Sequence, residues 1–360
     1  MDLSKHIPFN RWELILGVLI VVLITAAIGG SRLSRLFNTQ AVSSVEPVHI
    51  YLHDKTDLYE MSSILADSGV VIGQEELLWA GRLLGWRNFL PGHYEIQGSY
   101  SYDVFLSKMA RGIQDPVSVT IIPGSSEERI LRVLSTRLKA DSVAFHHAVE
   151  DSSFWENRSF ERKDFIGRMY PSTYSFYWTS SPKTIFNRIF REFEKEVAEG
   201  FEFRIREVDL TLDEVVTLAS IIEWEAMHED EKPKISGLYW NRLNKRMYLQ
   251  ADPTVVFALG ERRRLLYEDY EIDHPYNTYN HFGLPPGPIT NPNKNSIEAA
   301  LYPQDHDYLF MVASPEGYHI FSETFSEHKE KSVQWRRWIR EQYRKKKLEE
   351  VRAEEKEVNS

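Results

Sequence analysis

Apolar and polar positions divide the chain into one apolar N-terminal run and a much longer part in which the two kinds of residue alternate. Residues 14–28 (LILGVLIVVLITAAI) are apolar apart from Thr25, and Gly29 and Gly30 follow. The run is about 15 to 17 residues long, short of the ~20 that span a bilayer with ease but within reach of a single anchor. We therefore expect a transmembrane anchor at residues 14–30, preceded by a cytoplasmic tail at residues 1–13.

A cleaved signal peptide is the alternative for this segment, because residues 25–27 (TAA) offer small side chains for a cleavage site. We favour an uncleaved anchor because the apolar core is longer than that of a typical signal. Lys5 and Arg11 lie before the run and Arg32 and Arg35 after it, so positive charge does not settle the orientation. Because the bulk of the chain follows the run, we expect a single-pass protein of the cell (inner) membrane with its large part extracytoplasmic or periplasmic.

Short strand-like and helical patterns follow a polar linker, which we place at residues 31–46. The predicted elements are, in order, a strand at 48–52, a helix from 57 that ends near Gly69, a helix at 75–84 that ends at Gly85, a strand at 90–96, a helix at 101–111 and a strand at 117–122. The β-α-α-β order suits a compact module of about 70 residues. We place this module at residues 47–123.

The rest of the chain is predicted to be mostly helical at first and rich in turns later. Residues 127–206 have a helical pattern that an aromatic-rich loop interrupts at 170–178, and residues 211–246 form two further helices. Turn signals are frequent at 250–330. The fold class is therefore α+β, with an N-terminal transmembrane helix, the small module and a mixed α/β domain at 124–334. Alternating charge at 335–360 predicts a solvated tail with no chemistry of its own.

Composition excludes several classes of function. The net charge of −10 argues against a nucleic-acid-binding protein, which would show a basic footprint. The absence of cysteine excludes thiol catalysis, disulfides and cysteine-based zinc sites. Nine Trp, 18 Tyr and 19 Phe would suit the flat platforms of a carbohydrate site, although most aromatic side chains of any domain belong to its core.

One acidic residue lies on a helix that is otherwise mostly apolar. Thr211 and Glu214 form a capping box that marks the start of this helix. Its buried stripe is predicted to consist of Val215, Leu218, Ala219, Ile222 and Ala226. Glu223 then lies at the edge of the stripe, and Glu225 points about 200° away from it, toward solvent.

The position of Glu223 suggests acid catalysis. A carboxyl group held against hydrocarbon is disfavoured as an anion and keeps its proton. Such a group can donate its proton to a leaving group, as the acids of sugar-cleaving enzymes do. On the helix alone, a half-exposed glutamate without a catalytic role is the commoner outcome. Further along, Pro233 suits the first turn of a second helix, and the Pro-Pro-Gly-Pro sequence at 285–288 is a rigid turn.

These motifs, in this order, resemble the YceG-like endolytic murein transglycosylase family (MltG-type). The matching segments are 218–223 (LASIIE), 241–243 (NRL), 249–255 (LQADPTV), 276–279 (YNTY) and 283–289 (GLPPGPI), with 308–310 (YLF), 319–322 (HIFS) and 327–328 (EH) further along. The resemblance covers about residues 45–335. Trp224, Asn293 and Tyr318 depart from the residues that are common in the family, which bears on the shape of the groove more than on the acid.

The resemblance implies a membrane-anchored lyase that cuts within peptidoglycan strands, between N-acetylmuramic acid and N-acetylglucosamine, and leaves 1,6-anhydro-muramic ends. It also implies a role in ending glycan elongation during cell wall synthesis, with peptidoglycan strands as substrate and peptidoglycan synthases as partners. No metal or other cofactor is implied. By the same resemblance, residues 47–123 are a LysM-like module, residues 124–334 are the catalytic domain and Glu223 is the catalytic glutamate.

A transglycosylase of this kind can work with one carboxyl group, whereas most glycoside hydrolases use two. In our hypothesis Glu223 protonates the glycosidic oxygen, and its carboxylate then takes the proton of the C6 hydroxyl, which closes onto C1. Gln250, Asn277 and Tyr279 are the best candidates for binding sugar hydroxyls and acetamides, with a structural role in the loop equally open for each. Asp252 either caps a helix that starts there or contacts the substrate.

Two other interpretations were weighed against this one. A metal-dependent peptidoglycan hydrolase is suggested by the histidines, but no pair has the spacing of a zinc-binding HExxH motif, and activity that survives chelators would exclude it. The histidines are His274, His281, His306, His319 and His328. The other interpretation is a non-catalytic peptidoglycan-binding scaffold protein, for which binding to glycan without cleavage would be the evidence.

Overall fold

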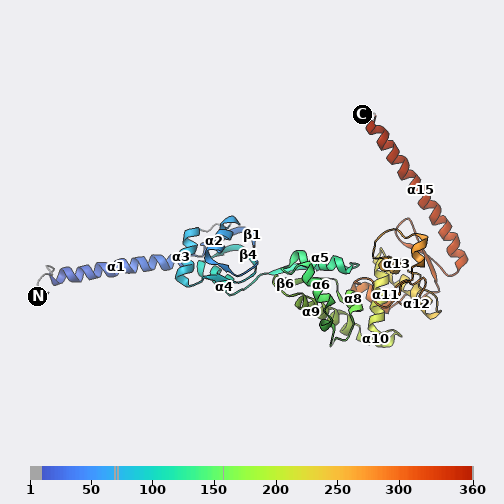
Figure 1. The fold of residues 1–360 in the computed structure, drawn as a ribbon, viewed down its shortest axis with the longest axis horizontal. Helices are drawn as coiled ribbons and strands as arrows, with labels where there is room; N and C mark the ends of the chain where they lie inside the picture. The colour runs from blue at the N-terminus through green and yellow to red at the C-terminus, as the bar shows by residue number, and fades with distance from the viewer. Residues whose placement is uncertain (1–9, 69, 71–72, 157, 359–360) are drawn as a thin grey trace. The chain divides into compact units, whose positions relative to one another are not determined.

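The computed structural model describes residues 10–68, 70, 73–156 and 158–358 (Figure 1). The chain forms two compact units. The first contains the described residues up to Val117 together with Ser175–Ser180, and the second contains Ser118–Tyr174 and the described residues from Ser181 onward. The first unit therefore ends ahead of the expected boundary at residue 123.

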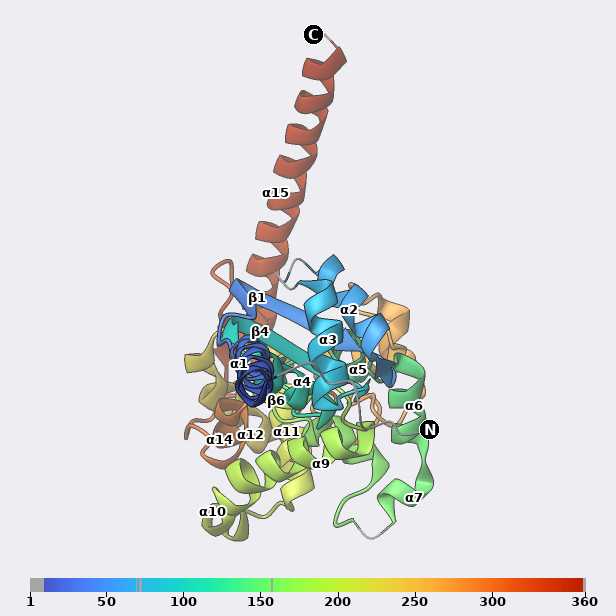
Figure 2. The ribbon, with the colours of Figure 1, turned by 90° about the vertical axis from the view of Figure 1, so that its left-hand side faces the viewer.

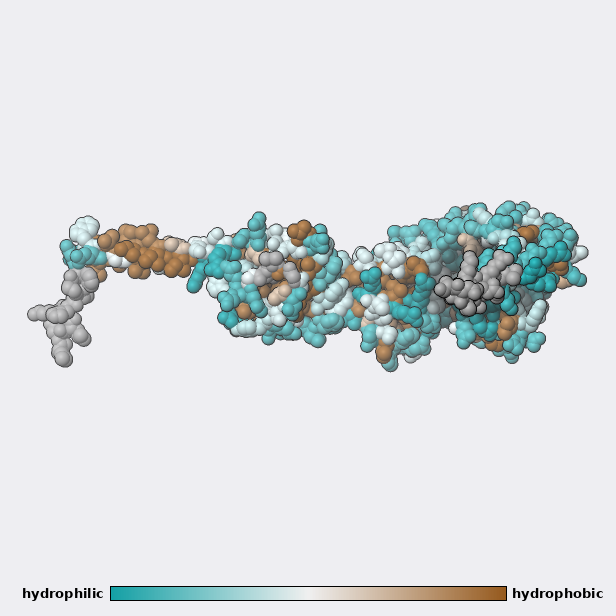
Figure 3. All heavy atoms as spheres, turned by 90° about the horizontal axis from the view of Figure 1, so that it is seen from above, coloured by the Kyte–Doolittle hydropathy of each residue, from teal (hydrophilic) through white to brown (hydrophobic). Residues whose placement is uncertain are grey.

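The N-terminal helix α1 (Arg11–Leu36) is, within the described residues, the one helix that is long and apolar enough to cross a membrane. Its apolar side chains face outward, as the brown surface near the N-terminus in Figure 3 shows. A signal sequence would pass the same test of length and composition, so the anchor stays a prediction. The helix continues to Leu36 and the first strand begins at Val42. The linker predicted at 31–46 is therefore much shorter, because Ser, Arg and Leu at 31–36 extend the helix.

The first unit is built on two long antiparallel strands. β1 (Val42–Leu52) pairs with β4 (Gly92–Tyr100), and Ile50 lies opposite Tyr94 in the register. The other elements are α2 (Leu58–Asp67), α3 (Gln74–Leu84), α4 (Tyr102–Ala110) and the short strands β2 (Thr56–Asp57) and β3 (Asn88–Phe89). The predicted order of strand, two helices and strand is thus present as β1, α2, α3 and β4.

Local sequence explains where these helices begin and end. The Asp57 carboxylate accepts hydrogen bonds from the first backbone N–H groups of α2, as an N-cap residue does. α3 ends at Gly85, whose φ of 82° lies in the left-handed region that glycine adopts without steric cost. The helices and strands enclose one apolar core that includes Met61, Leu77 and Phe105.

The second unit is mostly helical. Its helices are α5 (Glu127–Arg137), α6 (Ser142–Glu150), α7 (Ser152–Trp155), α8 (Phe165–Arg168), α9 (Pro182–Phe193), α10 (Glu202–Glu207), α11 (Leu212–Glu225), α12 (Lys232–Asn244), α13 (Asp252–Leu259), α14 (Lys294–Leu301) and α15 (Phe325–Val358). The shorter turns are η1 (Arg162–Asp164), η2 (Glu194–Glu199), η3 (Glu229–Glu231) and η4 (Tyr267–Glu271). The helical pattern predicted for 127–206 and the two helices predicted for 211–246 are confirmed.

Two pairs of strands complete the fold. β5 (Pro116–Ile121) pairs with β6 (Ser172–Tyr177), and β7 (Phe310–Ala313) forms an antiparallel pair with β8 (His319–Ser322). The aromatic-rich segment predicted as a loop at 170–178 is therefore largely a strand. Tyr174 and Phe176 are buried in it while their neighbours are exposed or half-buried, which is the period of two that a half-buried strand requires.

Helix α11 lies at the centre of the second unit and contacts α8, α12, α13 and α14. The capping box predicted at its start is confirmed, since Thr211 Oγ1 accepts from the Glu214 N–H and Glu214 Oε2 accepts from the Thr211 N–H. The single buried stripe is wrong, because every residue from 215 to 222 is buried. A helix enclosed by neighbours on all sides has no solvent face over this stretch.

Helix α15 is long, and its first turns pack against β7 and β8. The described part of the charged tail predicted at 335–360 belongs to α15, which begins earlier, at Phe325, and runs as one element to Val358 (Figure 2). Its first part therefore belongs to the packed domain, whereas the remainder carries the alternating charges.

Candidate active site

Glu223, in the last turn of α11, is held by polar groups from two neighbouring helices. Its Oε2 accepts hydrogen bonds from Ser296 Oγ at 2.6 Å, from the backbone N–H of Asn293 at 3.1 Å and from Lys232 Nζ at 3.3 Å. Ser296 and Asn293 belong to the start of α14, and Lys232 is the first residue of α12. The hydrocarbon environment that we expected for this carboxyl group is therefore wrong.

The buried ammonium of Lys232 connects Glu223 to other residues of the domain. Its side chain is 2% exposed and its ammonium lies 2.6 Å from Glu229 Oε1 as well as 3.3 Å from Glu223 Oε2. Asn293 Oδ1 accepts a third hydrogen bond from the same ammonium, at 3.2 Å. A buried ammonium is tolerated only when it is paired and hydrogen-bonded. The pairing of Glu223 with Lys232 thus joins the end of α11 to the starts of α12 and α14.

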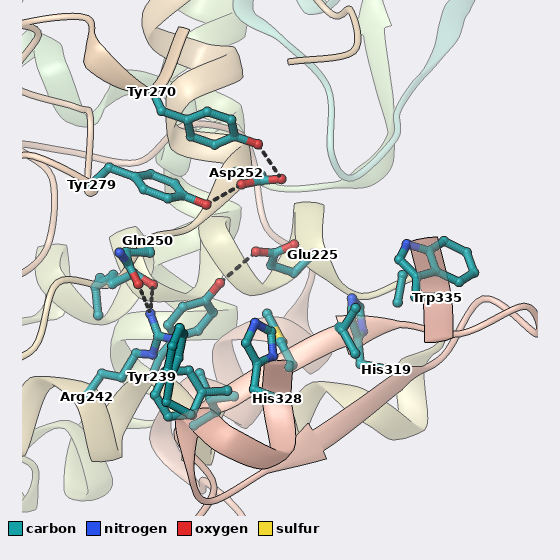
Figure 4. Close-up of a pocket in the computed structure, with 17 residues that line it drawn as sticks. Glu225, Tyr239, Arg242, Gln250, Asp252, Tyr270, Tyr279, His319, His328 and Trp335 are labelled. Carbon is teal, nitrogen blue, oxygen red and sulfur yellow. Dashed lines mark hydrogen bonds between the residues drawn. The ribbon is translucent and has the colours of Figure 1, made fainter. Parts of the chain in front are cut away.

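Glu225 lies two residues further on. It lines a cavity of about 530 Å³ that Glu223 does not line, which we call the tyrosine cavity (Figure 4). Its Oε1 accepts a hydrogen bond of 2.7 Å from the Tyr239 hydroxyl. Burial raises the pKa of Glu225 to about 7, although the hydrogen bond from Tyr239 acts in the opposite direction. The exposed position that we expected for Glu225 is wrong, because the side of α11 that faces away from Glu223 is covered by other elements of the domain.

Asp252 lines the tyrosine cavity beside Glu225 and binds two tyrosines. Its carboxylate accepts from the Tyr279 hydroxyl at 2.6 Å and from the Tyr270 hydroxyl at 3.3 Å. Burial raises the pKa of Tyr270 to about 12 and moves that of Tyr279 in the same direction, so both hydroxyls remain donors. α13 begins at Asp252, so its N-cap position belongs to Ala251, and the Asp252 side chain binds Tyr270 and Tyr279 instead of the start of the helix. The predicted helix cap is therefore replaced by a contact within the cavity.

Gln250 lines the same cavity and has an unusual backbone. Its φ is 49°, in the left-handed region that residues other than glycine rarely adopt. The backbone N–H of Gln250 donates to the carbonyl of Thr278 at 3.1 Å. Buried Arg242 donates to Gln250 Oε1 at 3.3 Å and to the carbonyls of Tyr248 and Leu249. These bonds hold the segment before α13 in place.

Asn277 has the contacts of the structural role in the loop, one of the two interpretations left open for it beside a contact with sugar. Its side chain is fully buried, and Nδ2 donates to the carbonyls of Tyr270 and Ile272 at 3.0 and 2.9 Å. Its Oδ1 accepts from the backbone N–H of Tyr279 at 3.0 Å. All the hydrogen bonds that we find for this amide therefore fix the loop that carries Tyr270 and Tyr279, and none of its atoms faces the tyrosine cavity.

Replacing Asn277 by alanine is expected to lower the free energy of unfolding by about 2–4 kcal/mol, because the Tyr279 N–H loses its acceptor, two carbonyls lose one donor each, and a buried side chain leaves a cavity. Asn280 provides a matched control. Its Nδ2 approaches the same two carbonyls, at 3.2 and 3.4 Å, but the side chain is exposed, so Asn280→Ala should cost less than about 1 kcal/mol. Denaturant unfolding of the two variants measures the difference. Equal losses would contradict the structural role of Asn277.

A second cavity, of about 730 Å³, contains both glutamates and is here called the glutamate cavity. Glu223, Glu225 and Asp252 all line it. Trp224 forms part of its wall, with Nε1 donating to the carbonyl of Gly124 at 3.0 Å. The guanidinium of Arg262 lies 4.2 Å from the centroid of the Trp224 ring. The two carboxyl groups that could donate a proton therefore border one space, together with Asp252.

A protein-family model described as the YceG-like family matches residues 50–334. This chain belongs to the YceG-like family. It is 29% identical over 322 residues to the endolytic murein transglycosylase of Bacillus subtilis (strain 168). This match covers 84% of this chain and 89% of that protein. It is 25% identical over 304 residues to the endolytic murein transglycosylase of Streptococcus pneumoniae serotype 2 (strain D39). This match covers 75% of this chain and 55% of that protein.

A solved structure supports the family membership. The crystal structure of a YceG-like protein from Listeria monocytogenes matches this chain with a TM-score of 0.56 and 30% sequence identity. The match covers 80% of this chain and 99% of that one. The YceG-like resemblance of the sequence motifs is thus confirmed by both kinds of comparison.

The histidines that suggested a metal site in this YceG-like chain have different partners, although His319 and His328 both line the tyrosine cavity (Figure 4). His319 Nδ1 lies 2.8 Å from Glu231 Oε2, and His306 Nε2 lies 2.9 Å from the carbonyl of Lys234. His328 stacks on Phe310. Across residues 10–358, with the short gaps given above, no three His, Asp or Glu side chains are grouped as metal ligands would be.

Glu225 is the site residue that sequence reasoning did not propose. One signal could have pointed to it. Positions 215–222 of this helix are apolar or small throughout, which is typical of a helix buried all round and leaves no solvent side for the residues that follow at its end. Glu225 then has to face either the core or a cavity. Its bond to Tyr239 joins residues from two helices and has no signature in the sequence.

Proposed function

We propose that this chain is an endolytic murein transglycosylase, a lyase that cleaves the bond between N-acetylmuramic acid and N-acetylglucosamine within glycan strands and leaves 1,6-anhydro ends. A relative that is similar over 84% of this chain has this name. One observation of the site supports the proposal most directly. Glu225, a carboxyl group with its pKa raised to about 7, lines a cavity together with the hydrogen-bonding side chains of Gln250, Asp252 and Tyr279.

The geometry favours Glu225 over Glu223 as the proton donor. Oε2 of Glu223 already accepts three hydrogen bonds, one of them from the buried ammonium of Lys232. Among the residues that the structure describes, Glu225 has one hydrogen-bond partner, the hydroxyl of Tyr239, and its burial favours the protonated form. We therefore assign the chemistry to Glu225 and a positioning role to Glu223, which fixes the end of α11 from which Glu225 projects.

The reaction then needs one carboxyl group in two protonation states. Glu225 gives its proton to the glycosidic oxygen as the bond from C1 of the muramic acid to O4 of the next sugar breaks. The 2-acetamido oxygen of the substrate stabilises the positive charge at C1. The Glu225 carboxylate takes the proton of the C6 hydroxyl, whose oxygen forms the new bond to C1. No water is consumed, and Glu225 ends the cycle protonated.

The other polar residues of the tyrosine cavity position the substrate. The Asp252 carboxylate accepts hydrogen bonds from Tyr270 and Tyr279, which leaves lone pairs for sugar hydroxyls. The amide of Gln250 can donate to an acetamide carbonyl while its oxygen stays bound to Arg242. We keep Gln250, Asp252 and Tyr279 as proposed substrate-binding residues, and we assign Asn277 to the support of the loop.

In this proposal the first unit attaches the chain to the membrane and binds glycan. α1 anchors the chain in the membrane as a single span, with the second unit outside the cytoplasm. The order β1, α2, α3, β4 supports a LysM-like glycan-binding module. The expectation of peptidoglycan synthases as partners rests on the resemblance alone.

The decisive experiment incubates the detergent-purified full-length protein with uncrosslinked glycan strands and identifies the products by mass spectrometry. Internal fragments that end in 1,6-anhydro-muramic acid are expected. Fragments with reducing ends only would show that water attacks C1 and would reject the lyase mechanism. Binding of strands without any cleavage would support the non-catalytic scaffold instead.

The proton on Glu225 predicts how activity depends on pH. Because the pKa of Glu225 is raised to about 7, kcat should fall as the pH rises through about 7 and the donor becomes ionised. The same shift links to stability. The folded chain binds this proton more tightly than the unfolded chain, so the contribution of Glu225 to stability is complete below its ordinary pKa of 4.5 and is lost as the pH rises through about 7. A kcat that increases steadily from pH 6 to pH 9 would argue against this donor.

A further inference from the structure

A third cavity, which we call the side cavity, has a volume of about 870 Å³ and shares Asp252 with the two cavities that Glu225 lines. Asp252 lines the side cavity, the tyrosine cavity and the glutamate cavity. Arg263 and Arg264 line both the side cavity and the glutamate cavity. The three spaces therefore meet around one carboxylate, and a branched ligand at Glu225 could extend into the side cavity.

The positive charges at this junction are unequally paired. Arg263 makes a two-pronged contact with Asp269, at 2.6 and 2.7 Å, and so has a structural partner. Arg262 donates to the carbonyl of Gly124 at 2.9 Å and lies over Trp224. Arg264 lies 5.9 Å from the ring of Tyr343. In the part of the chain that the structure describes, neither Arg262 nor Arg264 has an ion pair with a carboxylate.

The surroundings of Arg262 increase its need for an anion. Burial lowers the pKa of Arg262, and the charge of Arg129 lowers it further. A guanidinium that is partly withdrawn from water and repelled by a second one gains more from a bound carboxylate than a fully solvated one does. Its planar fork also matches the two oxygens of a carboxylate.

The side cavity has large apolar side chains in its wall beside its charged residues, which are Arg263, Arg264, Asp252 and Glu268. Tyr267 is 91% exposed and Leu266 is 52% exposed, although both are large apolar residues beside a cavity. Trp335, from α15, forms another part of the wall. Exposed apolar side chains that gather around a cavity are typical of a binding site. The side cavity therefore suits a ligand that has both small apolar groups and carboxylates.

We propose that the side cavity and the adjoining glutamate cavity bind the stem peptide of the muramic acid whose bond is cut. Arg264, which lines both cavities, and Arg262, which lines the glutamate cavity, would hold its carboxylates. Muramic acid carries its peptide on the lactyl group at C3 of the same ring whose C1 faces the acid. That peptide combines alanine methyl groups with free carboxylates, which is the chemistry that this cavity offers. The inference rests on the proposed function and makes it more specific: the substrate class is peptide-bearing glycan, and stripped glycan is a poor substrate.

The test compares two substrates with the full-length protein. One is uncrosslinked, peptide-bearing glycan, and the other is the same glycan after an amidase has removed the peptides. We expect kcat/KM to be about 10-fold higher or more for the peptide-bearing strands, mainly through a lower KM, since each hydrogen bond between charged groups strengthens binding by about 10-fold or more. The double variant Arg262→Gln/Arg264→Gln should lose this preference by slowing on peptide-bearing strands alone.

Controls separate the possible outcomes. Arg132→Gln, at an exposed arginine on α5 away from these cavities, should leave both rates unchanged, and the melting temperature of each variant reports on folding. Equal cleavage of both substrates by the unaltered protein would overturn the inference, and so would an equal loss on both substrates in the double variant. Products without anhydro ends from either substrate would reject the proposed function itself, which is a distinct result.

Discussion

Glu225→Gln is expected to lower kcat on glycan strands by about 10²–10⁴-fold, the usual contribution of a positioned general acid. The glutamine keeps an oxygen that can accept the hydrogen bond of Tyr239, so the cavity should keep its shape and the KM should change little. The measurement is the rate of release of anhydro-ended fragments at saturating substrate. A melting temperature equal to or above that of the unaltered protein would show that the loss is chemical.

Glu223→Gln is the matched comparison, because it makes the same chemical change two residues away. We expect a change in kcat of less than about 10-fold together with a clear loss of stability, since the ion pair with Lys232 is broken. If Glu223→Gln abolished cleavage while Glu225→Gln kept it, the sequence-based hypothesis of Glu223 as the acid would be restored and our assignment would be rejected.

Lys232→Met is expected to lower the free energy of unfolding by about 3–5 kcal/mol, because removing one partner of a buried ion pair leaves the other charge uncompensated. Lys232 is 2% exposed and its ammonium contacts Glu223, Glu229 and Asn293. Methionine fills a similar volume, so the effect reports on charge more than on packing. Denaturant unfolding at neutral pH gives the value.

A double-mutant cycle identifies the origin of this loss. If Glu223 and Lys232 interact as the structure indicates, Glu223→Gln combined with Lys232→Met should cost less than the sum of the two single changes. Lys245→Met, at an exposed position just after α12, is the control and should stay within about 0.5 kcal/mol. Strictly additive losses would show that the two side chains do not depend on each other.

Much of the fold could be predicted from local signals. The capping box at Thr211, the glycine that ends α3 and the proline in the first turn of α12 each mark a boundary through the chemistry of one or two residues. The strand at 172–177 was missed because its period of two lies inside a cluster of aromatic residues that also fits a loop. The start of α15 was missed because its first turns are held by contact with β7 and β8, and that contact is not local in sequence.

The site was predicted less well, for a physical reason. Gln250, Asp252 and Tyr279 do line one cavity, because their motifs are loops that the fold brings together. The two glutamates were ranked by a helical wheel that assumes one buried and one solvated side. The environment of each is set by residues distant in the chain, namely Lys232 and Ser296 for Glu223 and Tyr239 for Glu225. No spacing within α11 contains that information.

The left-handed backbone of Gln250 has a consequence for how this protein could change. Its φ of 49° costs a residue with a Cβ about 1–2 kcal/mol that glycine would not pay. Replacing Gln250 by glycine should therefore raise the free energy of unfolding of the domain while it removes an amide from the tyrosine cavity. Heat tolerance and turnover would then respond in opposite directions to the same substitution. Variants selected only for survival at high temperature should lose this glutamine early and become slower enzymes.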